Sequence, residues 1–277
     1  MCIRDRYNNA ETLFNNKKFK KSAKAYEAYY KQYPNDSFAP LAVQKHAISL
    51  EINKKLNDAF DVYQFCLDNY SNQIDNYNEV LDSQYSIALQ IMNKKRMALF
   101  GGGYSTPDLA IPYFEKIINN GPQWHMKPKA LFLIGKCYFD VKKYDEAIEI
   151  FRKFISLYPL NELAEESFWY QIQSLEILFK KYPESPEIQN RLLASSTIYL
   201  SDFPKSKRRN DVIKLRNSLY EIKANKIFKQ GHFYEQVAKN NKAALISYKQ
   251  LIKKFPKSKL ASKAQDKIIY LESNENI

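Results

Sequence analysis

The chain has 277 residues, of which 45% are hydrophobic and 14% aromatic, and its 43 Lys and Arg against 30 Asp and Glu give a formal net charge of +13. This content is ample for a buried core. No apolar run approaches the roughly 18 residues of a membrane-spanning helix, so we expect no transmembrane helix in this sequence.

The first six residues, Met-Cys-Ile-Arg-Asp-Arg, resemble the translation of a transposase adapter used in sequencing libraries. We therefore expect residues 1–6 to be an artefact, joined to a gene whose true start lies upstream. On this interpretation Cys2 is not a lipid-attachment site, and the lack of a signal peptide carries no information. The protein's own chain then begins near Tyr7, inside a helix.

A recurring phrase dominates the remaining sequence. It consists of an aromatic residue, then Ala or Ser, an aromatic residue four positions later, an apolar residue, and an aromatic-Pro pair. Full or partial copies occupy residues 19–34, 56–66, 110–122, 144–159 and 244–256. Self-similarity of this kind indicates an array of supersecondary units, which favours a binding scaffold over most enzyme folds.

The clearest unit lies at residues 131–159. Its apolar residues before Asp140 recur every three or four positions and so share one helical face. Gly135 and Ala147 are small where two helices must cross closely, while Phe151 supplies bulk. Pro159 ends the second helix, because proline lacks a backbone N–H and clashes with the preceding turn. The pattern resembles the tetratricopeptide repeat, with an irregular helical bundle as the alternative.

This spacing predicts an all-α, right-handed, tetratricopeptide-like solenoid of about five to six helix pairs, without a β-sheet. The expected pairs occupy residues 7–35, 38–72, 76–122, 127–160, 162–205 and 210–272. We group them as N-terminal repeats at 7–122, middle repeats at 127–205, and a C-terminal repeat with a capping helix at 206–277. Polar caps at the ends keep repeat arrays soluble.

Two pairs depart from the pattern. The third is interrupted at 96–107, where three consecutive glycines at 101–103 disfavour helix and predict a loop. Phe100 and Tyr104 flank these glycines and are candidate contacts. The fifth pair is degenerate, with Leu192, Ser196 and Tyr199 at the positions of Ala, an aromatic and an apolar residue.

No catalytic or metal-binding pattern is evident. His46, His125 and His232 are isolated and lack the spacings of zinc sites. Cys66 and Cys137 lie among apolar helical positions, which favours core filling over a disulfide. The glycine triplet lacks the Lys-Ser/Thr of a phosphate-binding loop. We therefore expect no enzymatic activity, no cofactor and no metal.

Three stretches carry a more specific resemblance. They are residues 19–36 (FKKSAKAYEAYYKQYPND), 99–123 (LFGGGYSTPDLAIPYFEKIINNGPQ) and 231–264, which contains Phe233-Tyr234 and Ala243-Ala244. Together they are similar to the BamD-type outer-membrane assembly lipoproteins. The region 127–205 departs from the shorter members by an apparent extra helix pair, and no lipid-bearing N-terminus is present.

The resemblance implies a lipid-anchored scaffold at the periplasmic face of the outer membrane. Its partners would be the β-barrel insertase, other assembly lipoproteins and unfolded barrel-protein segments. Extended segments would lie on a concave face formed by the first helix of each pair. By the repeat spacing, that face includes Tyr7, Glu11, Phe14, Gln44, Ile48, Glu51, Phe132, Lys136 and Phe139. The alternative for Phe14 and Phe139 is packing between helices.

Basic residues suggest a second surface. The C-terminal helices carry many lysines and few acids, and we expect Lys249, Lys253, Lys254, Lys257 and Lys259 to attract an acidic insertase domain. The alternative is that these lysines only solubilise the repeats. Two other functions stay open: a general tetratricopeptide adaptor in another envelope or cytoplasmic complex, and nucleic-acid binding. The scatter of the basic runs argues against nucleic acid.

Overall fold

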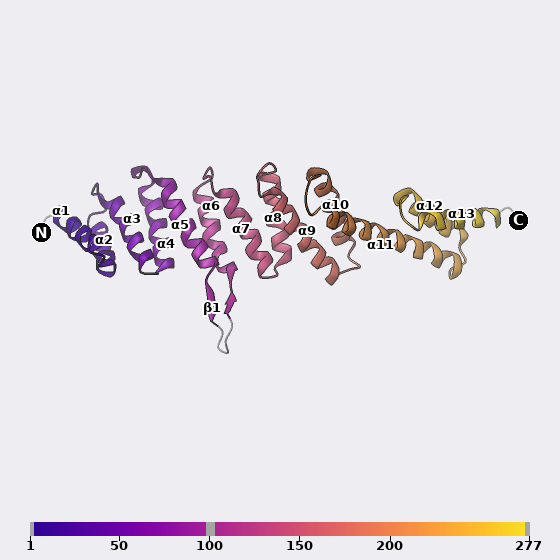
Figure 1. Cartoon of the computed structure of the whole chain (residues 1–277), viewed down its shortest axis with the longest axis horizontal. Helices are drawn as coiled ribbons and strands as arrows, with labels where there is room; N and C mark the ends of the chain where they lie inside the picture. The colour runs from indigo at the N-terminus through magenta and orange to yellow at the C-terminus, as the bar shows by residue number, and fades with distance from the viewer. Residues whose placement is uncertain (1–2, 98–102, 275–277) are drawn as a thin grey trace. The chain divides into compact units, whose positions relative to one another are not determined.

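A computed structural model describes residues 3–97 and 103–274, and it divides into two compact units, one up to Tyr170 and one from Gln171 onward. Helices dominate both units, which confirms the tetratricopeptide-like, all-helical fold class. Figure 1 shows the helices in chain order.

Unit 1 contains four helix pairs, each packed on its neighbour in sequence. Their bounds are α1 (Ile3–Asn15), α2 (Phe19–Gln32), α3 (Ala39–Ile52), α4 (Leu56–Tyr70), α5 (Tyr77–Met92), α6 (Ile111–Asn120), α7 (Lys127–Asp140) and α8 (Tyr144–Leu157). Short 3-10 turns at Ser71–Gln73 and Pro107–Ala110 precede α5 and α6. Helix α9 (Ala164–Lys181) runs across the division between the units.

A repeated helix crossing builds the core of unit 1. The small residues of the phrase are fully buried, and so are the large aromatics four positions later: Ser22 and Tyr26, Ala59 and Tyr63, Ala110 and Phe114, Ala147 and Phe151. A Cβ atom at Gly135 would lie 2.7 Å from the Phe151 ring. The Phe151 ring therefore fills the space at this crossing. That space exists because Gly135 on α7 has no side chain.

The turn inside a helix pair also repeats. Lys17, Lys54 and Lys142 precede α2, α4 and α8 by two positions, and each has a positive φ, between 56° and 63°. Left-handed backbone is costly for a residue with a Cβ atom, so these lysines carry local strain in return for a tight turn.

The aromatic-Pro pair forms the turn between helix pairs. After Tyr33-Pro34 the Asp36 carboxylate accepts the Phe38 backbone N–H at 2.9 Å, and after Tyr158-Pro159 the Asn161 side chain accepts the Leu163 N–H at 2.9 Å. The polar residue three positions after the aromatic thus satisfies an N–H group as the next helix begins. The repeated sequence pattern therefore includes a polar residue after the aromatic-Pro pair, which the apolar spacing alone did not indicate.

The interruption of the third pair contains a short hairpin. Strand β1 (Lys95–Met97) pairs antiparallel with β2 (Gly103–Ser105), with Arg96 opposite Tyr104. The expectation of a chain without any sheet is therefore wrong at this one place, where residues 95–97 and 103–105 satisfy one another's backbone groups. Figure 1 shows the hairpin projecting from unit 1 between α5 and α6.

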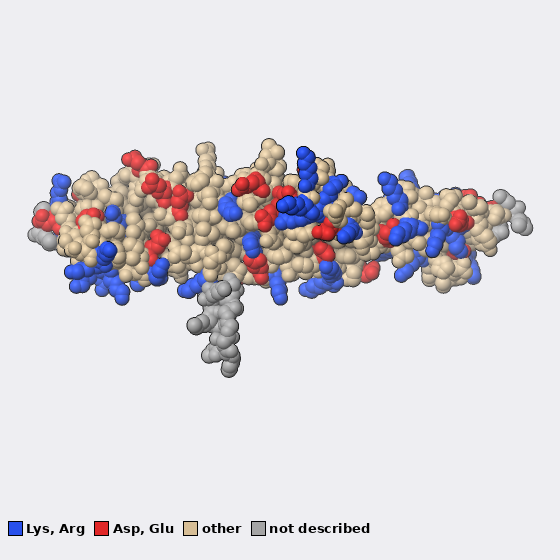
Figure 2. Space-filling view, in the orientation of Figure 1, with Lys and Arg blue, Asp and Glu red and all other residues tan. Residues whose placement is uncertain are grey.

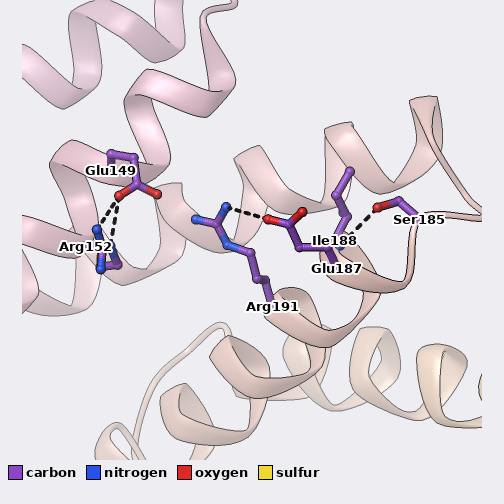
Figure 3. A network of polar contacts seen from close by, with 6 residues as sticks. All are labelled: Glu149, Arg152, Ser185, Glu187, Ile188 and Arg191. Carbon is purple, nitrogen blue, oxygen red and sulfur yellow. Dashed lines mark hydrogen bonds and ion pairs between the residues drawn. The ribbon is translucent and has the colours of Figure 1, made fainter.

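Unit 2 is organised around one long helix. Helix α11 (Arg209–Gln236) packs against α10 (Pro186–Asp202) and against α12 (Asn241–Lys254), and α13 (Ala261–Asn274) packs on α12. Helix α10 begins at a cap in which the Ser185 hydroxyl accepts the Ile188 N–H at 3.4 Å (Figure 3). The degenerate residues Leu192, Ser196 and Tyr199 are fully buried, so a larger Leu and a smaller Ser replace the Ala and aromatic of other repeats.

None of the described helices is long and apolar enough to cross a membrane. The cysteines fill the core as expected: Cys66 and Cys137 are buried and free, and burial raises the pKa of each thiol to about 12. Neither thiol is therefore a nucleophile at neutral pH.

Candidate docking surfaces

The residues expected on the concave face lie on α1, α3 and α7, and two of them are core residues. Tyr7 is 7% exposed and Phe132 is 4% exposed. The Tyr7 ring packs edge-on against Tyr29, and the Phe132 ring lies against Phe151. The structure therefore assigns both rings to packing within unit 1 rather than to an open surface.

Four further positions of this set are half-buried and bound to neighbouring helices. The Glu11 carboxylate accepts the Tyr26 hydroxyl at 2.5 Å, and Glu51 accepts Gln90 Nε2 at 3.3 Å. Gln44 exchanges side-chain hydrogen bonds with Asn76 at 2.9 and 3.2 Å. The Lys45 ammonium lies 4.6 Å from the centre of the Phe14 ring. The apolar spacing had not indicated Asn76 or Gln90, because polar partners leave no periodic signal.

Two further members of the set, Lys136 and Phe139, lie near Tyr170 at the end of unit 1. The Phe139 ring is 5.0 Å from the Tyr170 ring, and Lys136 pairs with Asp140 at 2.9 Å. Ile48 is half-buried on α3. Phe14 and Phe139 both have ring partners in neighbouring helices, which agrees with the packing alternative stated for them.

The two loop candidates are only partly open to description. Phe100 lies outside the described residues. Tyr104 is described by its backbone alone, which pairs with Arg96 in the hairpin. Both stay predictions.

Unit 2 contains a groove of about 870 Å³ over the middle of α11. We call it the α11 groove, and its lining residues are Leu193, Thr197, Arg216, Asn217, Ser218, Tyr220, Glu221, Lys257 and Lys259. Helix α10 supplies one wall, and the turn between α12 and α13 supplies the other. The long α11 leaves this stretch open, since α10 and α12 each pack on it separately.

Helix α11 fixes the turn that carries the groove lysines. Glu221 accepts the Ser258 hydroxyl at 2.8 Å and the Lys259 backbone N–H at 3.1 Å, so both carboxylate oxygens are occupied. The Tyr220 hydroxyl accepts the Lys257 N–H at 3.2 Å. The turn is thereby held by its backbone, and the lysine side chains are not used to hold it.

The cations of the α11 groove have no acidic partner. Within the described residues, Arg216, Lys257 and Lys259 form no ion pair with a carboxylate. Nearby on α11, burial lowers the pKa of Lys223, and the charges of Lys254 and Lys226 lower it further. Positive charge that the protein leaves uncompensated creates a potential that attracts an acidic partner.

The five lysines predicted as one basic interface do not form one surface. Lys257 and Lys259 line the α11 groove. Lys249 pairs with Glu272 at 2.7 Å and lies with Lys253 beside a separate shallow hollow. Lys254 neighbours Lys223. The sequence did not indicate Arg216. The run of lysines lies on α12 and the turn after it, whereas Arg216 lies on α11, against which α12 packs.

The histidines do not assemble a metal site. His46 is buried against Tyr30, while His125 and His232 are exposed. Within residues 3–97 and 103–274, no three His, Cys, Asp or Glu side chains are grouped as metal ligands.

Sequence comparison agrees with the repeat architecture. The tetratricopeptide repeat profile matches residues 129–161, which cover α7 and α8, and residues 227–258, which cover the end of α11 and α12. Comparison with curated proteins finds no match.

Solved structures of repeat proteins show a distant likeness. A tetratricopeptide repeat protein from Parabacteroides merdae is 11% identical, with a TM-score of 0.36 over 96% of this chain and 98% of the other. The C-terminal part of a repeat-containing protein from Cytophaga hutchinsonii is 16% identical, with a TM-score of 0.34 over 93% and 98%. PilW, a type IV pilus biogenesis factor, is 13% identical, with a TM-score of 0.33 over 95% and 98%. The chain therefore contains two tetratricopeptide repeats, at residues 129–161 and 227–258, within a fold built of helices.

Proposed function

We propose that this protein is a non-catalytic scaffold of the outer-membrane β-barrel assembly machinery, acting at the periplasmic face of that membrane. Tetratricopeptide repeats make the chain a protein-protein interaction scaffold. The more specific assignment rests on the resemblance of residues 19–36, 99–123 and 231–264 to BamD-type assembly lipoproteins.

The α11 groove is the observation that carries the proposal. Arg216, Lys257 and Lys259, which form no ion pair among the described residues, surround a cavity of about 870 Å³ whose acidic residue, Glu221, already accepts two hydrogen bonds. A partner that brings carboxylates to this groove gains Coulomb energy without breaking an existing ion pair. We assign the groove to an acidic surface of the barrel insertase.

Unit 1 offers a second, weaker surface for unfolded barrel-protein segments. The accessible parts of Glu11, Gln44, Glu51 and Lys136 present donors and acceptors that an extended backbone requires. With Tyr7 and Phe132 buried in the core, this face offers mainly polar contacts. Its affinity for any one segment is therefore expected to be low.

Calorimetry with the full chain and the periplasmic part of the cognate insertase tests the assignment. The triple variant Arg216→Gln, Lys257→Gln, Lys259→Gln removes the groove cations. The control Lys229→Gln, Lys242→Gln, Lys263→Gln removes three exposed lysines of unit 2 outside the groove, so the change in net charge is identical. We expect the groove variant to weaken binding at least about tenfold and the control to change it by less than about threefold.

Two results would contradict the proposal. If the insertase fails to bind the unmodified chain, the assignment to barrel assembly is wrong, and a general adaptor function takes its place. If both triple variants weaken binding equally, net charge and not the α11 groove is responsible. Raising the salt concentration should weaken binding to the unmodified chain, since mobile ions screen charges over about 8–10 Å.

A further inference from the structure

A second pocket, remote in sequence from the α11 groove, lies in unit 1 between α2 and α3. It has a volume of about 490 Å³. Lys20, Lys21 and Lys24 of α2 line one side, His46 of α3 lines the other, and Lys55 from the start of α4 closes one end. We call this cavity the α2 pocket. Figure 2 shows basic side chains gathered at the end of unit 1 where α2 begins.

Most of the positive charge of the α2 pocket has no acidic partner among the described residues. In the part of the chain that the structure describes, Lys20, Lys21 and Lys24 form no ion pair. The one carboxylate that lines the pocket, Glu27, is occupied by Lys31 at 2.7 Å. Lys55 pairs with the exposed Asp58 at 3.2 Å. The ammonium groups of Lys20, Lys21 and Lys24 therefore line one small cavity without an acidic partner among the described residues.

A buried histidine adds a directional group to this cavity. His46 is 5% exposed, and its Nδ1 lies 3.1 Å from the Tyr30 hydroxyl. Its Nε2 has no hydrogen-bond partner among the described residues, although the ring lines the pocket. When Tyr30 donates to Nδ1, the neutral imidazole carries its proton on Nε2 and can donate it to a ligand oxygen.

The first turn of α2 departs from its counterpart in α8. Helix α8 begins with Asp145 and Glu146, whose charges favour a helix N-terminus, whereas α2 has Lys20 and Lys21 at the same positions. Cations at a helix N-terminus oppose the helix dipole and lower the stability of the first turn. The first turn of α2 is therefore less stable than that of α8, and a bound anion would stabilise it.

We propose that the α2 pocket binds a phosphate-bearing ligand, with Lys20, Lys21, Lys24 and Lys55 neutralising its charge and His46 Nε2 donating to one oxygen. Multivalent oxyanions match several ammonium groups at once, whereas one carboxylate leaves most of them unpaired. The phosphate source is a soluble phosphorylated compound or a lipid headgroup.

Pyrophosphate titrated into the full chain tests the site by calorimetry. The double variant Lys20→Gln, Lys24→Gln should raise the dissociation constant at least about tenfold, because two charge-assisted contacts are lost. The control Lys17→Gln, Lys18→Gln removes two charges from the same turn, but neither residue lines the pocket. Its dissociation constant should stay within about twofold. Equal weakening in both variants would overturn the proposal, as would undetectable binding to the unmodified chain.

The imidazole of His46 provides an independent readout by nuclear magnetic resonance. Without ligand its pKa is lowered, first by burial and then by Lys31 and Lys55, while Glu27 and Asp58 oppose the shift. A bound oxyanion beside Nε2 should raise this pKa and move the ring resonances, while His125 and His232 stay unchanged. A titration that leaves His46 unmoved would place the anion elsewhere and refute the assignment.

Vesicle sedimentation separates the two phosphate sources. If the ligand is a lipid headgroup, the chain should sediment with phosphatidylglycerol vesicles and not with phosphatidylcholine vesicles, and pyrophosphate should compete. The Lys20→Gln, Lys24→Gln variant should then stay in solution while the Lys17→Gln, Lys18→Gln control sediments. If pyrophosphate binds and neither vesicle does, the ligand is a soluble phosphorylated compound.

Discussion

Two matched repeats, residues 129–161 in unit 1 and 227–258 across α11 and α12 in unit 2, share one buried skeleton but differ in charge. A Cβ atom at Gly135 would meet the Phe151 ring at 2.7 Å, and one at Gly231 would meet the Tyr248 ring at the same distance. The first repeat has six basic and four acidic residues, whereas the second has seven basic residues and one acidic residue.

The difference shows which positions carry the fold and which carry binding. The small residue and the aromatic ring are fixed by packing, so they recur in both units. Substitutions at exposed positions change stability little. The second repeat has fewer acidic residues at such positions and is therefore more positively charged. Its single acid, Glu235, is buried and accepts the Tyr248 hydroxyl at 2.8 Å and Lys267 Nζ at 2.6 Å.

The largest effect is expected from removing the shared aromatic. Phe151→Ala deletes a fully buried ring and should lower the free energy of unfolding by about 3–5 kcal/mol. Tyr248→Ala should cost a similar amount in unit 2. Chemical denaturation monitored by circular dichroism measures both. A loss below about 1 kcal/mol in either variant would show that the crossing is not a common structural element.

Enlarging the small residue should have the next largest effect. Ala147→Leu places extra atoms at a close helix crossing and should destabilise by about 1–3 kcal/mol through overpacking. The same substitution at the exposed Ala28 of α2 is the control and should be nearly neutral. A thermal melt of Ala147→Leu that matches the unmodified protein would mean that the crossing has spare volume.

The buried carboxylate predicts a pH dependence found in the second repeat alone. Burial alone would raise the pKa of Glu235, but the hydrogen bonds from Lys267 and Tyr248 and the charge of Lys267 outweigh it and lower the pKa. Its stabilisation is therefore complete above the unfolded value of about 4.3 and is lost as the pH falls through the lower folded value.

Glu235→Gln tests this link. The variant should be less stable by about 1–2 kcal/mol at pH 7, and its stability should fall less steeply on acidification below pH 4.3. Stability measured at a series of pH values distinguishes the outcomes. An acid limb as steep as that of the unmodified protein would mean that other carboxylates dominate.

The smallest effect concerns the strained turns of the two repeats. Lys142 and Lys239 have φ angles of 63° and 52°, which glycine adopts without steric cost. Lys142→Gly and Lys239→Gly should each stabilise by about 0.5–1 kcal/mol, after the entropy of glycine is deducted. The neighbouring Lys143 has a φ of −86°, so Lys143→Gly should not stabilise. A gain at Lys143 equal to that at Lys142 would exclude backbone strain as the cause.

Sequence predicted the helices and the buried phrase well, because packing imposes a period that composition reveals. The spacing placed Ala147 and Phe151 at a close helix crossing, and both are fully buried. The spacing wrongly placed Tyr7 and Phe132 on an open surface. An apolar residue at a given helical position gives the same sequence pattern whether that face of the helix contacts solvent or a neighbouring helix. The hairpin at residues 95–105 was missed because glycine signals a turn without specifying the strands beside it.

The candidate sites were less predictable. The lysines at 257 and 259 were visible as a basic run, but their grouping with Arg216 depends on the hydrogen bonds of Tyr220 and Glu221 to a turn 37 or more residues later. The α2 pocket likewise joins lysines of one helix to a histidine of the next. Such groupings arise from tertiary contacts, which carry no local periodicity.

Hydrogen exchange of the full chain, with and without the periplasmic part of the insertase, tests the central claim most directly. The account predicts that binding slows exchange in the segments that form the α11 groove, residues 216–221 and 255–260, and that the Arg216→Gln, Lys257→Gln, Lys259→Gln variant loses this protection. Protection confined to unit 1, or protection of the groove that survives the triple substitution, would contradict it.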